Sequence, residues 1–308
     1  MSTRSATHVE TSVLQPQATL TLSNSAATYS TIPASKAKET AAQEAIAAGG
    51  YTLEGIPTFP DFESHRRWIR EHMAAAFRSL GRQGLAEGLA GHISVRDPEH
   101  TDRFWMNPLG VHFSMMKASD MVLVDYHGNV VGGNKVAVNA AGFQIHSAVH
   151  RARPDVHAAC HAHGISGRAW SAFGKPLEML CQDSCVFYNS HSVYNNFGGV
   201  VFEGEEAERL AESVAGNNKA VILQNHGLLT VGETVDEATY LFQLMERLCE
   251  IQLKVEAASA AGNLEKVFVK DDAAKYTFDM AQDPLTLYQE FQPTFKYEMW
   301  KSKGDLKE

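Results

Sequence analysis

Two histidines, His161 and His163, flank a single alanine at the end of the apolar stretch DVHAACHAH. In a β-strand, residues i and i+2 project from the same face, roughly 6.5–7 Å apart along the backbone. Two imidazoles placed in this way can converge on one metal ion, with Zn–N bonds of about 2.0–2.1 Å. The pattern indicates part of a metal site, although two histidines with ordinary hydrogen bonds would leave the same pattern.

A third ligand is available in the next strongly apolar stretch, VILQNHGLLTVG. His226 follows the apolar run, and Gly227 allows the backbone to bend away directly after it. Spacing alone leaves two interpretations open. The three histidines hold one metal ion, or they are three unrelated loop residues.

The elements that must position these histidines are an alternation of strands and helices. Helices are predicted from helical spacing of apolar residues and from capping signals, over residues 61–81, 138–152, 164–174, 204–216 and 235–262. Strands are predicted over residues 91–96, 102–108, 155–163, 219–225 and 226–232, with a hairpin at 121–133. The order predicts a single α/β domain built on a mostly antiparallel or mixed sheet.

The composition divides the chain into three parts. Residues 1–50 are rich in Ser, Thr, Ala and Gln and are expected to form a flexible tail. Residues 51–261 carry the predicted domain. Residues 262–308 are charged and aromatic without a clear period, and we expect them to form an arm that packs on the body or on a neighbour.

Charge and cysteine content limit the class of protein. The chain has 308 residues and a net charge of −9, which argues against nucleic acid or an anionic membrane as a partner. No apolar run is long enough to span a bilayer, and the N-terminus has no signal-type apolar core. The four cysteines show no CxxC spacing, and Cys181 and Cys185, four residues apart, have no second pair beside them. All four are interpreted as thiols of a cytoplasmic protein.

Three longer stretches together resemble the class II aldolase/adducin superfamily. They are ARPDVHAACHAHGISGRAWSAFGKPLEML, KAVILQNHGLLTVGETVDEA and GLAGHISVRDPE. The resemblance implies a three-layer α/β/α domain around a mostly antiparallel sheet. It also implies that His161, His163 and His226 hold a divalent cation, zinc first, with iron or manganese as alternatives. A small-molecule substrate is then expected between the subunits of a homotetramer.

The sequence departs from the sugar-phosphate aldolases of this superfamily. Those enzymes carry an acid/base glutamate one helical turn before a histidine that matches His146, and here that position is Gly142. Gln144 is a poor substitute, because an amide does not titrate and lies elsewhere on the helix. Three pairs that would bind phosphate are also changed, to Gly91-His92, Leu109-Gly110 and Ala140-Ala141. We therefore expect no sugar-phosphate aldol chemistry.

Without the glutamate, acid/base work falls to other groups near the metal. The catalytic candidates are His92 and His146, because histidine titrates near neutral pH. Tyr188 and Tyr194 are further candidates, since the resemblance allows a tyrosine of this segment to reach the substrate of an adjacent subunit. Ordinary packing of any of these four side chains is the alternative.

Three functions are compatible with these residues. The first is a metal-dependent carbon–carbon lyase or decarboxylase that acts on a small non-phosphorylated oxo or hydroxy acid. The second is a non-haem iron oxygenase that acts on an aromatic 2-oxo acid. The third is a non-catalytic assembly module like the adducin head. The sequence favours an enzyme, because an assembly module does not need all three metal histidines.

Overall fold

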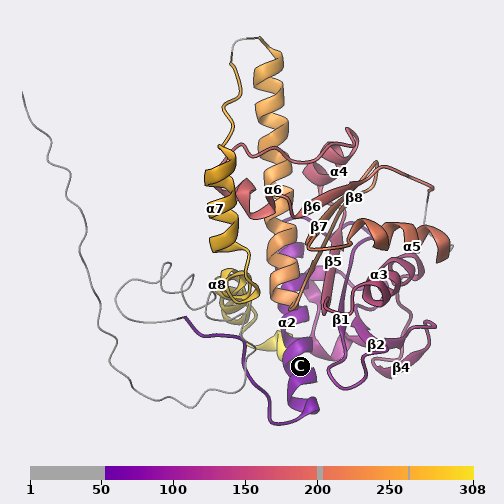
Figure 1. The fold of residues 1–308 in the computed structure, drawn as a ribbon. Helices are drawn as coiled ribbons and strands as arrows, with labels where there is room; N and C mark the ends of the chain where they lie inside the picture. The colour runs from indigo at the N-terminus through magenta and orange to yellow at the C-terminus, as the bar shows by residue number, and fades with distance from the viewer. Residues whose placement is uncertain (1–52, 200–203, 263) are drawn as a thin grey trace, which may run out of the picture. The chain divides into compact units, whose positions relative to one another are not determined.

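The computed structural model describes residues 53–199, 204–262 and 264–308 of the chain. The tail expected at residues 1–50 lies outside the described residues. Elements are labelled as in Figure 1, where the first described helix is α2.

A sheet of eight strands forms the middle layer (Figure 1). Its spatial order is β4-β3-β2-β1-β5-β8-β7-β6, and all neighbouring strands are antiparallel except β6 and β7. The strands are β1 (His92–Arg96), β2 (Arg103–Met106), β3 (Val122–Asp125), β4 (Val130–Gly133), β5 (Ala158–Ala162), β6 (His191–Tyr194), β7 (Ala220–Leu223) and β8 (Gly227–Gly232). The predicted mostly antiparallel sheet is confirmed.

Helices cover both faces of this sheet. The α-helices are α2 (Phe62–Arg82), α3 (Ala140–Ala152), α4 (Ile165–Ser171), α5 (Gly204–Ser213), α6 (Val235–Ala260), α7 (Asp271–Ala281) and α8 (Pro284–Ser302). Short 3-10 helices are η2 (Phe113–Met115), η3 (Ala118–Asp120), η4 (Gln182–Phe187) and η5 (Asp305–Lys307). Helices α2, α6 and α8 pack on one face and α3 and α5 on the other, which confirms the three layers.

Strand alternation divides the core into its two halves. In β5, Ala158 and Cys160 face the core shared with α2 and α6, whereas Ala159 faces the core shared with α3 and α5. Because side chains alternate along a strand, His161 shares the face of Ala159. The register pairs His161 with His92 of β1, so both imidazoles begin on the α3 side of the sheet.

Capping residues explain where the long helices begin. The Asp61 carboxylate accepts from the Ser64 N–H at the start of α2, and the Thr234 hydroxyl accepts from the Glu237 N–H at the start of α6. The Thr234 and Glu237 pair of the sequence predicts a capping box at α6, and in the structure it is only half formed. Glu237 accepts from the N–H of Glu233, one residue before the N-cap, and also binds Lys219.

Two parts of the fold were not predicted as regular elements. Strand β6 is a half-buried edge strand with the polar sequence HSVY, so it lacks the apolar run of the other strands. Residues 264–308 contain α7 and α8, and α8 packs against α2 and α6 through Leu287 and Phe291. Within the described residues, no helix has the length and apolarity needed to cross a bilayer.

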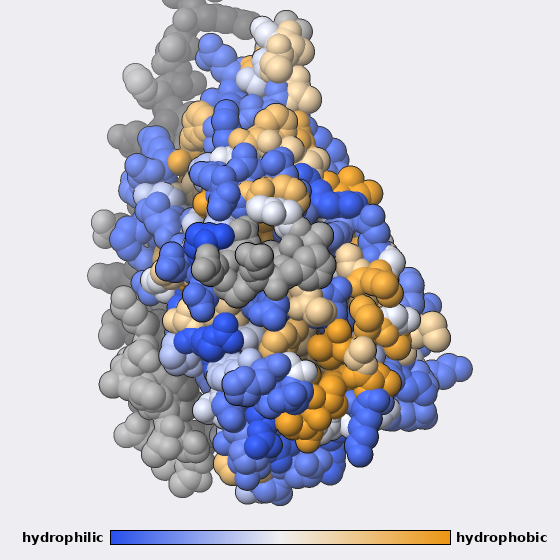
Figure 2. All heavy atoms as spheres, turned by 90° about the vertical axis from the view of Figure 1, so that its right-hand side faces the viewer, coloured by the Kyte–Doolittle hydropathy of each residue, from blue (hydrophilic) through white to orange (hydrophobic). Residues whose placement is uncertain are grey.

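Large apolar side chains are exposed on part of the surface. Val130 and Val131 of β4 and Val136 before α3 are each more than a third exposed. Figure 2 shows apolar side chains gathered on the side of the molecule that carries α3, α5 and β4 in Figure 1.

Candidate metal centre

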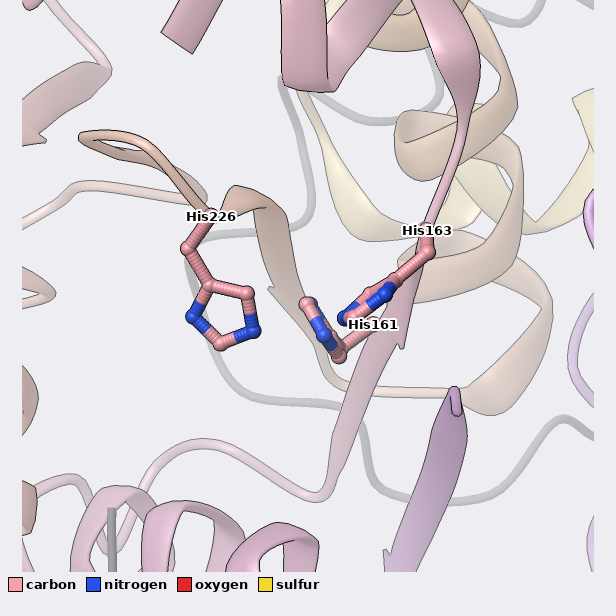
Figure 3. A group of neighbouring side chains, drawn as sticks. All are labelled: His161, His163 and His226. Carbon is pink, nitrogen blue, oxygen red and sulfur yellow. The ribbon is translucent and has the colours of Figure 1, made fainter. Parts of the chain in front are cut away.

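Three imidazoles meet where β5 ends and β8 begins. His161 is the fourth residue of β5, His163 follows the strand directly, and His226 lies in the turn between β7 and β8. The ring centroids are 4.8–5.3 Å apart, and one nitrogen from each ring lies within 4.8 Å of the other two. Figure 3 shows the rings grouped around a common space.

The turn that carries His226 depends on two unusual backbone conformations. Asn225 has φ +57° and Gly227 has φ +149°. The second value is accessible only to glycine at low cost, so Gly227 allows the chain to reverse directly after His226. The antiparallel pair formed by Leu223 and Gly227 closes this turn. The bend expected at Gly227 is confirmed.

Hydrogen bonding prepares His161 to act as a ligand. Its Nδ1–H donates to the Leu228 carbonyl over 2.7 Å, because a carbonyl oxygen can only accept. The Nε2 atom is therefore the nitrogen that keeps a lone pair. Metal-bound histidines are commonly fixed in this way through the second ring nitrogen.

Burial keeps the three rings neutral, which is the form that binds a metal. Desolvation, followed by the neighbouring His163, lowers the pKa of His226 to about 4. Desolvation also holds the pKa of His161 well below its ordinary value. For His163, desolvation and then the charge of Arg168 lower the pKa. Three neutral nitrogen donors on two strand ends fit a divalent cation such as Zn²⁺.

A half-buried glutamate holds the segment that follows His163. The Glu246 carboxylate of α6 accepts from the N–H groups of Ser166 and Gly167, over 2.7 and 2.9 Å. Glycine is needed at 167, since a Cβ there would lie 2.6 Å from the Glu246 Oε2 atom. Burial raises the pKa of Glu246. This contact fixes the backbone on the C-terminal side of His163.

We expect Glu246→Gln to loosen the metal centre. The amide retains one acceptor, so one of the two N–H groups loses its partner, at a cost of about 1–3 kcal/mol in the free energy of unfolding. Thermal or denaturant unfolding with and without zinc measures both stability and metal affinity. Glu250→Gln is the control, because Glu250 lies one turn later and makes an exposed i,i+4 pair with Lys254. Equal effects of Glu246→Gln and Glu250→Gln on stability and zinc affinity would contradict the role of Glu246.

His92 lies against the three-histidine cluster. Its ring centroid is 4.9 Å from that of His161, and its Nδ1 is 2.7 Å from His146 Nε2. A Cβ added to Gly142 would lie 2.6 Å from His92 Nε2. The imidazole therefore fills the space in which a side chain at position 142 would begin, and the glycine in helix α3 is required by this close approach.

The other candidates occupy different places. His146 contacts His92 through its Nε2 atom and is fully buried. Tyr194, at the end of β6, lines a small pocket together with Phe197 and His226. Tyr188 follows η4 and, within the described part of the chain, has no hydrogen bond or ring contact with the three histidines.

Apolar side chains surround the loops that were compared with a phosphate site. The Asn139 side chain donates to the Leu89 carbonyl, and a Cβ at Gly110 would lie 3.9 Å from the Leu89 side chain. Leu89 and Leu109 are both exposed there. A phosphate needs hydrogen-bond donors, and leucine side chains supply none.

Sequence reasoning missed three residues that support the site. Ser94 and His150 hydrogen-bond behind His92 and His146, and Glu246 reaches the segment after His163 from another helix. The spacing of His146 and His150 was a usable signal, since residues i and i+4 share one helix face. No local signal marks Glu246, which lies 80 residues from Ser166.

Comparisons with known proteins agree with this fold. A sequence model of the Class II Aldolase and Adducin N-terminal domain matches residues 71–253. The chain is 48% identical to the Meiotically up-regulated gene 14 protein of Schizosaccharomyces pombe, covering 82% of this chain and 98% of that protein.

Two similar proteins come from Streptomyces. The 4-hydroxy-3-prenylphenylpyruvate oxygenase/4-hydroxy-3-prenylbenzoate synthase of Streptomyces roseochromogenus is 39% identical, over 77% of this chain and 84% of that protein. Decarboxylase NovR of Streptomyces niveus is 40% identical, over 77% and 86%.

Among solved structures, the L-fuculose 1-phosphate aldolase from Glaciozyma antarctica PI12 has a TM-score of 0.75 and 38% identity. The match covers 82% of this chain and 97% of that one.

Proposed function

Because this chain belongs to the class II aldolase and adducin family, we propose that it is a divalent-metal-dependent carbon–carbon lyase. The proposed reaction is decarboxylation, or a related C–C cleavage, of a small non-phosphorylated 2-oxo or 2-hydroxy acid. One observation carries the proposal. The His92 imidazole occupies the space of a side chain at position 142, beside His161.

The cation would be held by His161, His163 and His226, with zinc as the first choice and iron or manganese as alternatives. When bound, it would supply Lewis-acid polarisation of the oxygen atoms of a chelating acid. Three protein ligands leave coordination positions for such an acid, as in catalytic zinc sites.

The surrounding side chains suit a small anionic substrate. Arg168 brings a positive charge next to His163, where its guanidinium also pairs with Glu87 over 2.7 Å, and its Cγ lies 3.7 Å from the position that a Cβ on Gly227 would take. His92 is proposed as the acid/base group that touches the substrate, with His146 acting through it. Tyr194 lines the pocket beside His226 and is proposed as a second proton donor, with Tyr188 as the weaker candidate.

The names of similar proteins support this class of substrate without identifying it. One relative is named a decarboxylase and another acts, by its name, on a substituted phenylpyruvate. The similar solved structure is named a sugar-phosphate aldolase. Two features argue against sugar-phosphate aldolase activity in this chain. They are Gly142 and the leucine side chains around the loops at Leu89 and Leu109.

The test offers the metal-loaded protein a panel of acids and one sugar phosphate. Protein reconstituted separately with Zn²⁺, Mn²⁺ and Fe²⁺ is incubated with aliphatic and aromatic 2-oxo and 2-hydroxy acids, and CO₂ release and product mass are measured. We expect turnover of at least one acid and none of L-fuculose 1-phosphate. Cleavage of the sugar phosphate alone would refute the proposal.

A second candidate function is a non-haem iron oxygenase acting on an aromatic 2-oxo acid. The all-imidazole donor set and the similar Streptomyces oxygenase favour it. Oxygen uptake by the Fe²⁺-loaded protein, coupled to consumption of the acid, would distinguish it from the lyase. Anaerobic turnover with Zn²⁺ would instead favour the lyase. A native protein that contains no metal would favour the third candidate, an adducin-like assembly module.

We also propose that the chain forms a homotetramer in the cytoplasm, with active sites between subunits. The exposed apolar side chains on the face shown in Figure 2 support association. Native mass spectrometry, compared with the chain mass of 33.8 kDa, tests the subunit number.

A further inference from the structure

A continuous series of hydrogen bonds leads from the metal centre into the space between the sheet and α3. His92 Nδ1 is 2.7 Å from His146 Nε2, and His146 Nδ1 is 2.6 Å from the Ser94 hydroxyl. The same hydroxyl is 2.8 Å from His150 Nε2, and His150 Nδ1 is 3.4 Å from the Val156 carbonyl oxygen. We call His92, His146, Ser94 and His150 the relay. All four side chains are buried.

The far end of the relay sets its direction. A carbonyl oxygen can only accept, so His150 must carry its proton on Nδ1 and present a lone pair at Nε2. The carbonyl is itself held in place, since Arg96 donates to Val156 O from Nε and Nη2 over 3.3 and 3.1 Å. Arg96 also donates to the His150 carbonyl over 2.6 Å, which fixes the backbone of α3 next to the ring.

Each remaining proton then has only one position. The Ser94 hydroxyl donates to His150 Nε2, so its oxygen accepts from His146 Nδ1–H. His146 Nε2 consequently carries a lone pair and accepts from His92 Nδ1–H. The opposite order would place the lone pair of His150 Nδ1 against the Val156 oxygen, and two acceptors repel each other.

We propose that the relay fixes His92, whose ring lies 4.9 Å from that of His161, as its Nδ1–H tautomer, so that its Nε2 carries a lone pair. Ser94, His146 and His150 are then positioning residues that act through His92. The assignment of His92 as the group that touches substrate rests on the proposed function, whereas the tautomer follows from the relay alone.

Burial supports neutral rings along the relay. Desolvation, followed by the charge of Arg96, lowers the pKa of His150 to about 3. Desolvation and the neighbouring His150 hold the pKa of His146 well below its usual range. A neutral imidazole has one donor and one acceptor, as the relay requires.

This tautomer restricts the chemical group that can face His92. An Nε2 lone pair accepts a hydrogen bond and cannot donate one, and no described residue hydrogen-bonds to this atom. The substrate group placed there must be a donor, such as the hydroxyl of a 2-hydroxy acid. An unprotonated carboxylate or phosphate oxygen, or a ketone oxygen, only accepts. The relay therefore selects for a hydroxyl at this position and against phosphate.

The test reads tautomers directly and does not require turnover. Long-range ¹H–¹⁵N spectra of zinc-loaded, ¹⁵N-histidine-labelled protein distinguish Nδ1–H from Nε2–H rings. Resonances are assigned by comparison with His92→Asn, His146→Asn and His150→Asn. We expect Nδ1–H rings for His92, His146 and His150. An Nε2–H ring at His92 in the unsubstituted protein would overturn the proposal.

Ser94→Ala removes the link between the two halves of the relay. We expect a tautomer shift at His146 and His92 and at least a tenfold loss of kcat with metal content unchanged. Ser79→Ala is the matched control, because Ser79 is also buried and hydrogen-bonded but belongs to α2 and contacts Gln243. Unchanged tautomers in a folded Ser94→Ala protein would refute the positioning role.

The two proposals fail in different ways. Nδ1–H rings in a protein that turns over none of the acids would refute the proposed function and leave the relay intact. Turnover by a protein with an Nε2–H ring at His92 would refute the relay and leave the proposed function intact. Should Ser94→Ala not fold, the tautomers of the unsubstituted protein still decide the matter.

Discussion

Replacing His161 by alanine is expected to remove both the bound metal and the catalytic activity. His161 is the most buried of the three imidazoles and the one whose lone pair is oriented by a backbone carbonyl. With His163 and His226 alone, the site has two nitrogen donors, fewer than catalytic zinc sites use. We expect metal content to fall from roughly one ion per chain to background, and turnover with it.

Elemental analysis of the purified protein and steady-state assays with added metal measure these two effects. His127→Ala is the control, because His127 is exposed in the turn between β3 and β4. Circular dichroism should show the same fold for both variants. Full activity of metal-free His161→Ala protein would end the idea that a metal is needed.

Gly142→Ala is expected to reduce turnover by a factor of about 10²–10⁴ while the metal stays bound. The factor is that of losing a positioned general acid or base. The new Cβ would lie within 2.6 Å of His92 Nε2, so the imidazole must leave its place. Alanine is otherwise the better helix residue, by about 1 kcal/mol, so the loss would not reflect a weaker helix.

A double-mutant cycle separates this effect from general damage. If Gly142→Ala acts through His92, adding it to His92→Ala should change kcat little further, because the ring it displaces is already absent. Metal analysis of all three variants shows that the cluster persists. If the double variant instead lost kcat by the product of the two single-variant factors, Gly142→Ala would not be acting through its contact with His92.

Periodic patterns were sufficient to predict most of the fold. Helices α2, α3 and α6 have apolar residues at helical spacing and clear capping residues, and β5, β7 and β8 are nearly continuous apolar runs. Strand β6 escaped prediction because an edge strand with half-buried polar residues has no such run. Helix α8 escaped because its apolar residues form no regular stripe, and α7 escaped because Ala274 is its one buried residue.

The candidate site, like the fold, could be predicted from the sequence only in part. The strand period placed His161 and His163 on one side, and the His-Gly pair after the next apolar run indicated His226, since both depend on local sequence. The relay depends instead on the β1–β5 register and on how α3 docks against the sheet. Those long-range relations have no signature in a single sequence. Gly142 was therefore interpreted as the loss of a glutamate, whereas the structure shows that it makes room for His92.

The tight fit between positions 92 and 142 has an evolutionary consequence. A carboxylate-bearing side chain at 142 and an imidazole at 92 exclude one another, because they compete for one volume. Evolution from one arrangement to the other must pass through a protein that has neither the carboxylate at 142 nor the imidazole at 92, or must change both codons together. Substitutions at positions 92 and 142 are therefore expected to depend on one another. The residues found at these two positions should separate the lineages of the family more cleanly than overall sequence identity does.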